Sequence, residues 1–333
     1  MQKRALGNLR EISRLTLGGG GIGQVWGSTS RDEAIATVLE ASAAGINLFD
    51  MAPIYGANAE AEIVMGLAFA NGYPKDLHVT TKCMLGATDP QQIASRLTAS
   101  LDASMTRMKR DFVDLFILHG YVIPDDWQDC AVPAALPRVA VEWSNFRQHV
   151  IPTFERLKAE GRIGGWGITA AGPQETNLEV IQGTPKPDVV QCITNLLDSP
   201  GSMHIAREAP DPRTVIRTAA QHGVGVMGIR AVAAGSLAAS IDRAVKPHST
   251  EQRDYDRAAG FRAIAAELGI PPAILAHRYA LSMDGVDTLV LGVKNRQELQ
   301  DCLAAEAAPN LDSQLMRRIE AAVAVAPENT SKT

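Results

Sequence analysis

The 333-residue sequence predicts an α/β protein with the (β/α)8 TIM-barrel fold, organised as a single domain. Two observations lead to this prediction. Short segments rich in branched apolar residues alternate with amphipathic helical segments along the whole chain. Such an alternation implies parallel strands joined by right-handed crossovers. The predicted strands number eight, which favours a closed barrel over an open sheet.

The predicted strands share short apolar runs that end in turn or polar residues. They lie at Leu15–Gly18, Ile46–Asp50, Leu77–Lys82, Val113–His119, Gly165–Thr169, Val189–Ile193, Val224–Ile229 and Thr288–Gly292. A doubly wound sheet is the alternative, and a nucleotide-binding sheet of that kind carries G-x-G-x-x-G between a strand and a helix. The glycine run from Gly18 to Gly23 comes closest, but a loop through Thr29 separates it from the first predicted helix. The barrel is therefore favoured.

Two of the helices between the strands have clear sequence signals. The helix predicted at Arg31–Ala44 starts with a capping box, in which Ser30 is the N-cap and Glu33 lies three residues further on. Gly45 is suited to end this helix. A second apolar stripe at helical spacing predicts a helix at Gln91–Met108.

Three predicted connections are longer than usual, and all three leave the C-terminal ends of strands. They span Gly120–Arg147, Leu196–Pro212 and Arg230–Asp256. Active sites of (β/α)8 barrels are built at this face, so we expect a covered site there. No linker divides the chain. We therefore predict one domain over residues 1–325, followed by a polar tail at 326–333 that is expected to fray.

Composition excludes several classes of partner. The formal net charge is −5 and no block of Lys and Arg is present, which argues against a nucleic-acid partner. No apolar run is long enough for a membrane span, and the N-terminal segment lacks a secretory pattern, so we expect a cytoplasmic protein without a membrane partner. The four cysteines and seven histidines lack metal-ligand spacing, and no metal site is expected. The sequence indicates no oligomeric state.

Three successive predicted strands end in an ionisable residue. Asp50, Lys82 and His119 follow apolar runs at matching positions, and Tyr55 lies five residues after Asp50. Each residue alone has an ordinary structural reading, as a turn cap, a rim cation or a core histidine. Buried charges are costly unless they pair, so three at matching strand ends predict a catalytic cluster.

The chemistry of this cluster follows from pKa values. A free phenol has a pKa near 10, and a neighbouring lysine is expected to lower the pKa of Tyr55. A carboxylate beside Lys82 keeps the lysine charged, and His119 can orient the substrate oxygen. The set predicts proton exchange with a carbonyl or alcohol oxygen, and the hydride must come from a bound nicotinamide.

Aromatic residues gather in the loops expected above this cluster, in a chain that is only 5% aromatic. They are Trp26, Tyr121, Trp127 and Trp143, which we interpret as substrate contacts for a flat or cyclic ligand. Ordinary loop packing is the alternative.

At this point the chain resembles the aldo-keto reductase family. The resemblance is carried by Asp50-Met-Ala-Pro-Ile-Tyr55-Gly56, Lys82, Leu118-His119, Gly165-Trp-Gly-Ile-Thr169, Gln191 and Gly292-Val-Lys-Asn295. It extends from Leu15 to Leu303. It implies a barrel that binds extended NADPH without a Rossmann domain and reduces aldehydes or ketones. It also implies Tyr55 as proton donor, Lys82 and Asp50 as the pair that tunes its pKa, and His119 as the residue that orients the carbonyl.

The resemblance further implies a set of cofactor contacts. They are Gly19, Gly20, Asp50, Thr169, Gln191, Ile229, Arg230, Gly292, Val293, Lys294, Asn295, Glu298 and Cys302. Several depart from the family pattern: Thr169-Ala170 replaces Ser-Asn, Ile229 replaces an aromatic residue, and Glu298 and Cys302 stand where Gln and Asn are usual. Arg230 is expected to reach the pyrophosphate.

Cofactor choice depends on Lys294. The resemblance places it at the adenosine 2′-phosphate, which favours NADP(H), with NAD(H) as the alternative. Glu298 lies one helical turn beyond Lys294 and could pair with it instead.

The sequence therefore predicts NADPH-dependent reduction of an aldehyde or ketone, a small-molecule carbonyl substrate. Two other functions stay open: an NAD(P)-dependent sugar 1-dehydrogenase, and a cofactor-sensing regulatory subunit with slow turnover. The complete set of Asp50, Tyr55, Lys82 and His119 disfavours the regulatory subunit, which has no need of all of them.

Overall fold

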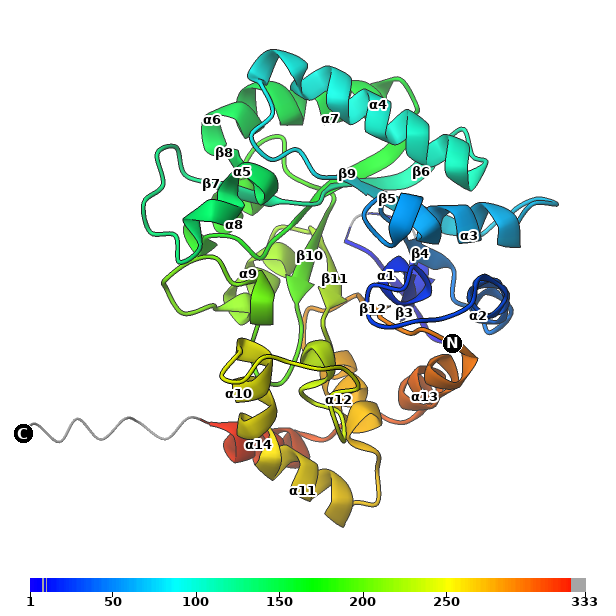
Figure 1. Ribbon diagram of the computed structural model, residues 1–333, viewed down its shortest axis with the longest axis vertical. Helices are drawn as coiled ribbons and strands as arrows, with labels where there is room; N and C mark the ends of the chain where they lie inside the picture. The colour runs from blue at the N-terminus through cyan, green and yellow to red at the C-terminus, as the bar shows by residue number, and fades with distance from the viewer. Residues whose placement is uncertain (8, 10, 325–333) are drawn as a thin grey trace, which may run out of the picture.

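The computed structural model describes residues 1–7, 9 and 11–324, and the predicted tail at 326–333 lies outside this part of the chain. Its centre is a closed parallel barrel with the strand order β10-β11-β12-β3-β4-β5-β6-β9 (Figure 1). The strands are β3 (Leu15–Gly18), β4 (Leu48–Asp50), β5 (His78–Cys83), β6 (Val113–Leu118), β9 (Ile163–Thr169), β10 (Val189–Ile193), β11 (Gly225–Ile229) and β12 (Thr288–Leu291). The predicted (β/α)8 barrel is confirmed, and each barrel strand overlaps a predicted one.

Helices surround the barrel and bury their apolar faces against its outer surface. The longer ones are α2 (Arg31–Ala43), α3 (Glu60–Ala68), α4 (Pro90–Met108), α7 (Ile151–Ala159), α8 (Gln174–Gln182), α9 (Pro212–Gln221), α10 (Thr250–Arg257), α11 (Ala259–Glu267), α12 (Pro272–Leu281), α13 (Arg296–Ala307) and α14 (Ser313–Val323). Shorter pieces are α1 (Gly19–Ile22), α5 (Leu136–Val139), α6 (Trp143–Asn145) and the turns η1 (Ala57–Ala59), η2 (Pro133–Ala135), η3 (Phe146–Val150), η4 (Gly201–Met203) and η5 (Ala233–Gly235).

The start of α2 shows how far the capping prediction holds. The Glu33 backbone N–H donates to Ser30 Oγ at 3.1 Å, as a capping box requires. The reciprocal half of the box is absent, because the Glu33 carboxylate accepts from the backbone N–H of Arg296 at 3.0 Å and from its guanidinium. Glu33 therefore ties α2 to α13 instead of capping its own helix, and the capping box is corrected to a single Ser30 cap.

Two small sheets were not predicted. Strands β1 (Lys3–Ala5) and β2 (Glu11–Ser13) form an antiparallel pair. Ile12 of β2 and Leu6, which follows β1, are buried and join an apolar cluster with barrel residues such as Met227. Strands β7 (Tyr121–Ile123) and β8 (Ala140–Glu142) pair in parallel within the long connection after β6. Strands of three residues are too short to show periodicity in sequence.

Helices α11 and α12 are consecutive in the sequence, and both are rich in apolar residues. Within the part of the chain that the structure describes, no single helix is long and apolar enough to cross a membrane. The two helices satisfy that test of length and composition only as a pair, and the pair is bent by 99° at its break. Their buried residues, including Phe261 and Tyr279, pack in the main apolar core.

Candidate active site

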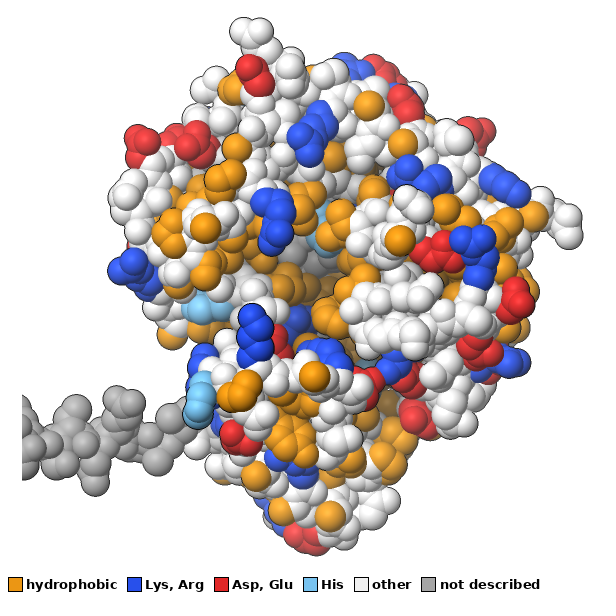
Figure 2. Space-filling view, in the orientation of Figure 1, with side chains coloured by type: hydrophobic (Ala, Val, Ile, Leu, Met, Phe, Trp, Pro, Cys, Tyr) orange, Lys and Arg blue, Asp and Glu red, His pale blue; other side chains and the backbone are white. Residues whose placement is uncertain are grey.

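The barrel brings the four predicted catalytic residues to one end. Asp50 is the last residue of β4, Lys82 is the penultimate residue of β5, and His119 directly follows β6. These strands are neighbours with parallel pairing, so their C-terminal ends meet at one edge. Tyr55 returns to this edge on the loop after β4. The face that carries α1 and α10 has a hollow near its centre, edged by hydrophobic and basic side chains (Figure 2).

Lys82 is the hub of the cluster and is fully buried. Its Nζ donates to Asp50 Oδ2 at 2.7 Å, to Tyr55 Oη at 2.9 Å and to the Met51 carbonyl at 3.2 Å. The other carboxylate oxygen of Asp50 accepts from Gln191 Nε2 at 2.9 Å. All three protons of the ammonium group are thus used, and a buried ion pair with complete hydrogen bonding is the form that the interior tolerates.

The electrostatics of Tyr55 differ from the sequence-based expectation. Burial raises the pKa of the Tyr55 phenol, Lys82 opposes this effect, and Asp50 adds to it, so that the pKa lies above its usual range. We expected Lys82 to lower it; burial outweighs the lysine because the phenol is removed from water. Burial lowers the pKa of Lys82, but Asp50 and Tyr55 outweigh burial and raise it. Tyr55 therefore keeps its proton and Lys82 keeps its charge.

His119 stands beside the phenol. Its ring meets the Tyr55 ring edge-on, with centroids 5.4 Å apart. Burial, reinforced by the positive charge of Lys82, holds the pKa of His119 well below its usual range. Its Nδ1 is buried and has no hydrogen-bond partner among the described residues. A neutral imidazole offers one donor and one acceptor nitrogen, so His119 can donate to an uncharged oxygen.

Residues predicted for the nicotinamide half of the cofactor line the ends of β9, β10 and β11. Thr169 is buried, and its hydroxyl donates to the Leu118 carbonyl at 3.3 Å. The Gln191 amide nitrogen is already held by Asp50. Ile229 ends β11 and is only partly buried. They lie on three neighbouring strands of the barrel, and their contact with the cofactor stays a prediction.

Arg230 has a buried guanidinium with nitrogens that are free to bind an anion. It has a positive φ of 63°, and its carbonyl accepts from Asn195 Nδ2 at 3.2 Å, which holds the backbone in this unusual conformation. Its Nε and Nη2 are buried without a hydrogen-bond partner among the described residues. A buried guanidinium with unsatisfied N–H groups is costly, and an anionic group removes that cost. This observation fits a dinucleotide pyrophosphate.

The glycine run after β3 permits a close approach of two chain segments. A Cβ on Gly21 would lie 1.9 Å from the Val293 carbonyl oxygen, so only glycine fits where α1 passes the end of β12. Trp26 packs here too. A Cβ on Gly20 would lie 2.8 Å from its Nε1, and one on Gly292 would lie 3.5 Å from its Cδ1. Trp26, predicted as a substrate contact, is therefore placed against two glycines of the predicted cofactor set.

After the end of β12, three residues of the predicted cofactor set have partners within the protein. Lys294 is paired with Asp242, a residue that sequence reasoning missed, and with Glu298 Oε1 at 3.1 Å. Asn295 Oδ1 accepts from the Glu298 backbone N–H at 2.9 Å and so caps α13. Cys302 is buried, with its Sγ 3.6 Å from His277 Nε2 on α12. This partner accounts for the buried thiol of Cys302, and its predicted contact with the cofactor stays a prediction.

Three of the four loop aromatics have packing partners within the long connections: Tyr121, Trp127 and Trp143. Tyr121 is 8% exposed, and its hydroxyl donates to the Met203 carbonyl at 3.1 Å. Trp127 packs against the small apolar cluster to which Tyr121 belongs. Trp143 stacks on Phe146, with ring centroids 6.0 Å apart. Loop packing thus accounts for contacts of all three side chains, and their substrate role stays a prediction.

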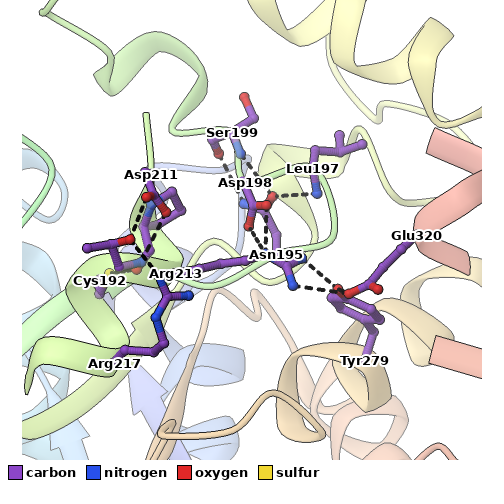
Figure 3. Close-up of polar contacts among 12 residues, drawn as sticks. Cys192, Asn195, Leu197, Asp198, Ser199, Asp211, Arg213, Arg217, Tyr279 and Glu320 are labelled. Carbon is purple, nitrogen blue, oxygen red and sulfur yellow. Dashed lines mark hydrogen bonds and ion pairs between the residues drawn. The ribbon is translucent and has the colours of Figure 1, made fainter. Parts of the chain in front are cut away.

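A second cluster of tyrosine, cation and carboxylate lies outside the barrel (Figure 3). Arg213 Nη2 donates to Tyr279 Oη at 2.7 Å, Arg213 Nη1 donates to Glu320 Oε1 at 3.0 Å, and its Nε donates to Asp198. Tyr279 in turn donates to Glu320 Oε1 at 2.5 Å. This cluster joins α9, α12 and α14 to the loop after β10.

The fold and the site together define a class of protein: a parallel barrel in which a buried Asp50, Lys82, Tyr55 and His119 cluster and an arginine with unpaired buried nitrogens lie at the C-terminal ends of the strands. The model of the Aldo/keto reductase family matches residues 14–324, and the chain belongs to this family of NAD(P)H-dependent oxidoreductases. Members act on small-molecule carbonyl substrates.

The chain is also similar to individual proteins with different printed names. The chain is 26% identical to the L-galactose dehydrogenase of Arabidopsis thaliana over 96% of its length and 94% of the relative. It is 23% identical to a probable voltage-gated potassium channel subunit beta of Oryza sativa over 90% of this chain and 89% of that one. An aldo-keto reductase from Bacillus halodurans, solved in its holo form, shares the fold with a TM-score of 0.72 and 23% identity, covering 98% of this chain and 99% of the other.

Proposed function

We propose that this protein interconverts a carbonyl group and an alcohol of a small substrate, with Tyr55 as the proton donor in reduction. The observation that carries the proposal is the hydrogen bond from Lys82 Nζ to Tyr55 Oη at 2.9 Å, backed by Asp50 at 2.7 Å. A bound nicotinamide supplies the hydride in reduction and accepts it in oxidation.

The direction of this hydrogen bond determines what Tyr55 can do. Because Lys82 donates to the phenol oxygen, the hydroxyl proton of Tyr55 must point elsewhere, and no acceptor for it exists among the described residues. It is therefore free for a substrate oxygen in the hollow. As the proton leaves, the ammonium of Lys82 stabilises the phenolate. Neutral His119 can donate to the same substrate oxygen and hold it beside Tyr55.

The residues that would hold the cofactor follow the ends of β9 to β12. Thr169, Gln191 and Ile229 would contact the nicotinamide half, and Arg230 the pyrophosphate. The segment after β12, from Gly292 to Lys294, would contact the adenosine half together with the glycines of α1. The unsatisfied nitrogens of Arg230 support this path.

Two alternatives draw support from the comparisons. Sugar oxidation is favoured second, because the similarity to an L-galactose dehydrogenase spans 96% of this chain. A regulatory role is third. It draws support from the similarity to potassium channel subunits, but the fully assembled Asp50, Tyr55, Lys82 and His119 cluster favours turnover.

The test is a turnover assay of the full chain against a panel of aldehydes, ketones and sugars with NADH, NADPH and their oxidised forms. We expect turnover with at least one substrate, and a fall of about 100-fold or more in Tyr55→Phe, which removes only the hydroxyl. Cofactor affinity should not change in this variant. Near-normal turnover in Tyr55→Phe would contradict the proposal.

A further inference from the structure

The surroundings of Lys294 bear on which cofactor the protein selects. Lys294 follows β12, and only 17% of its side chain is exposed. Its Nζ is in contact with Asp242 from the connection between β11 and α10, and lies 3.1 Å from Glu298 Oε1 of α13. The second oxygen of Glu298 accepts from the Lys294 backbone N–H at 2.9 Å. Two carboxylates therefore share one ammonium.

Among the described residues, the groups next to Lys294 add little positive charge for a phosphate. Asn295 uses its side-chain oxygen to cap α13, which fixes the side chain and leaves only its neutral Nδ2 amide as a donor. Arg296, which could have reinforced the positive charge, turns to Glu33 and pairs with it at 3.0 Å. Arg243 lies with its Nη1 3.9 Å from Asp242 Oδ1. Around Lys294, two cations thus face two carboxylates, and the group has no net positive charge.

On this basis we propose that Asp242, together with Glu298, makes the adenosine end of the cofactor groove selective for NAD(H) over NADP(H). The inference rests on the proposed function, since it assumes that this groove holds the cofactor. A 2′-phosphate carries close to two negative charges and would have to displace Asp242 from Lys294. A 2′-hydroxyl carries none and can donate a hydrogen bond to either carboxylate.

The placement of the residues explains why Glu298 and Asp242 keep their contacts with Lys294. Glu298 is anchored twice, through the backbone and the side chain of Lys294, in the first turn of α13. The stem of Lys294 lies against Gly27 of the loop after α1, where a Cβ would come within 3.2 Å of its Cδ. Lys294 therefore lies between three segments that meet here, and Asp242 closes this arrangement from the strand-β11 side.

The experiment measures dissociation constants for NADH and NADPH by quenching of protein fluorescence, with the full chain and without substrate. We expect the dissociation constant of the parent for NADH to be lower than that for NADPH by a factor of about 10 or more. Asp242→Asn keeps the shape and removes the charge, so NADPH should bind about 10-fold more tightly while NADH changes by less than about 3-fold. Glu298→Gln should shift the ratio in the same direction and by less, because Asp242 remains.

A matched control is Asp256→Asn, which removes the same charge from an exposed position on α10, in the segment that follows Asp242. It should leave both dissociation constants unchanged. Parent protein that binds NADPH as tightly as NADH, or an Asp242→Asn variant that shifts both cofactors alike, would overturn the inference. Failure to bind either cofactor would instead overturn the proposed function, and the inference with it.

Discussion

Two clusters in this molecule are built from the same kinds of side chain but have different surroundings. In the barrel, the phenol oxygen of Tyr55 accepts from Lys82, and no described residue accepts its proton. In the outer layer, Tyr279 accepts from Arg213 at 2.7 Å and donates to Glu320 at 2.5 Å. The outer phenol is saturated by the protein, whereas the inner one has a proton left to give.

The burial of the cations differs as well. Lys82 has no exposed surface, whereas the Arg213 side chain is 34% exposed and can also be solvated by water. Burial raises the pKa of Tyr279, and its bond to Glu320 raises it further, so this phenol does not ionise. The comparison teaches that a tyrosine, a cation and a carboxylate do not by themselves define a reactive site, and the proposed function depends on a phenol proton that has no acceptor among the described residues.

The largest expected effect is that of Lys82→Met. The charge that stabilises the Tyr55 phenolate is lost, so kcat should fall by about 100-fold and the pH at which alcohol oxidation reaches its maximum should rise. The variant also leaves Asp50 buried without its cation, at a cost of about 3–5 kcal/mol in the free energy of unfolding. The double variant with Asp50→Asn should recover stability but not turnover. A change in KM alone would make Lys82 a substrate anchor instead.

The second effect concerns pH and His119. An imidazole with the ordinary pKa of about 6.5 is mostly protonated at pH 5.5, which would cost about 10-fold in activity. Because the pKa of His119 is held well below that value, kcat/KM for reduction should change by less than about 2-fold between pH 7.5 and 5.5. A fall centred near pH 6.5 would contradict this.

Stability responds to the same group. The unfolded chain takes up the His119 proton first, so the free energy of unfolding should decline as the pH drops below about 6.5. The pH profile is therefore to be recorded well below the melting temperature at each pH.

The third effect isolates the outer cluster. Arg213→Met removes the bonds to Asp198, Tyr279 and Glu320. It should lower the free energy of unfolding by about 1–2 kcal/mol, a modest value because Arg213 and its two carboxylate partners are partly exposed. Turnover should stay within about 2-fold of the parent. Arg317→Met, at an exposed position on α14, the helix that carries Glu320, serves as the control and should change neither quantity.

The smallest effect sharpens the contrast between the two phenols. Tyr279→Phe should cost about 1 kcal/mol of stability in urea denaturation and leave turnover unchanged, since Arg213 keeps its carboxylates. Tyr55→Phe should cost less stability than that, because Lys82 keeps Asp50 and the Met51 carbonyl, and yet it should abolish most turnover. Equal effects on activity would show that the two clusters are not functionally distinct.

The polar residues at the strand ends could be predicted because their signal lies in a few neighbouring positions of the sequence. Each barrel strand is a short apolar run, and a polar residue after it must lie at the mouth of a parallel barrel, which is why Asp50, Lys82 and His119 could be identified together. The Ser30 cap was predictable for the same reason, since its bond to the Glu33 N–H spans three residues. The cytoplasmic location and the substrate contacts stay predictions.

Contacts between distant segments were not predictable. Gln191 reaches Asp50 across 141 positions, and Lys294 meets Asp242 across 52. Nothing around Asp242 in sequence distinguishes it from other loop carboxylates. Cys302 matched a cofactor position by spacing, and its thiol also lies against His277 of α12.

By itself, the sequence determined the eight-stranded barrel and the identity of the Asp50, Tyr55, Lys82 and His119 set, because periodicity and strand ends are local properties. Only the tertiary structure decided which charges remain free. Burial reversed the expected direction of the Tyr55 pKa. Arg213 and Glu320 occupy both hydrogen-bonding positions of the Tyr279 hydroxyl, and Asp242 and Glu298 both pair with Lys294. The physical reason is that a pKa or a charge balance depends on every group within a few ångströms, and folding alone brings those groups together.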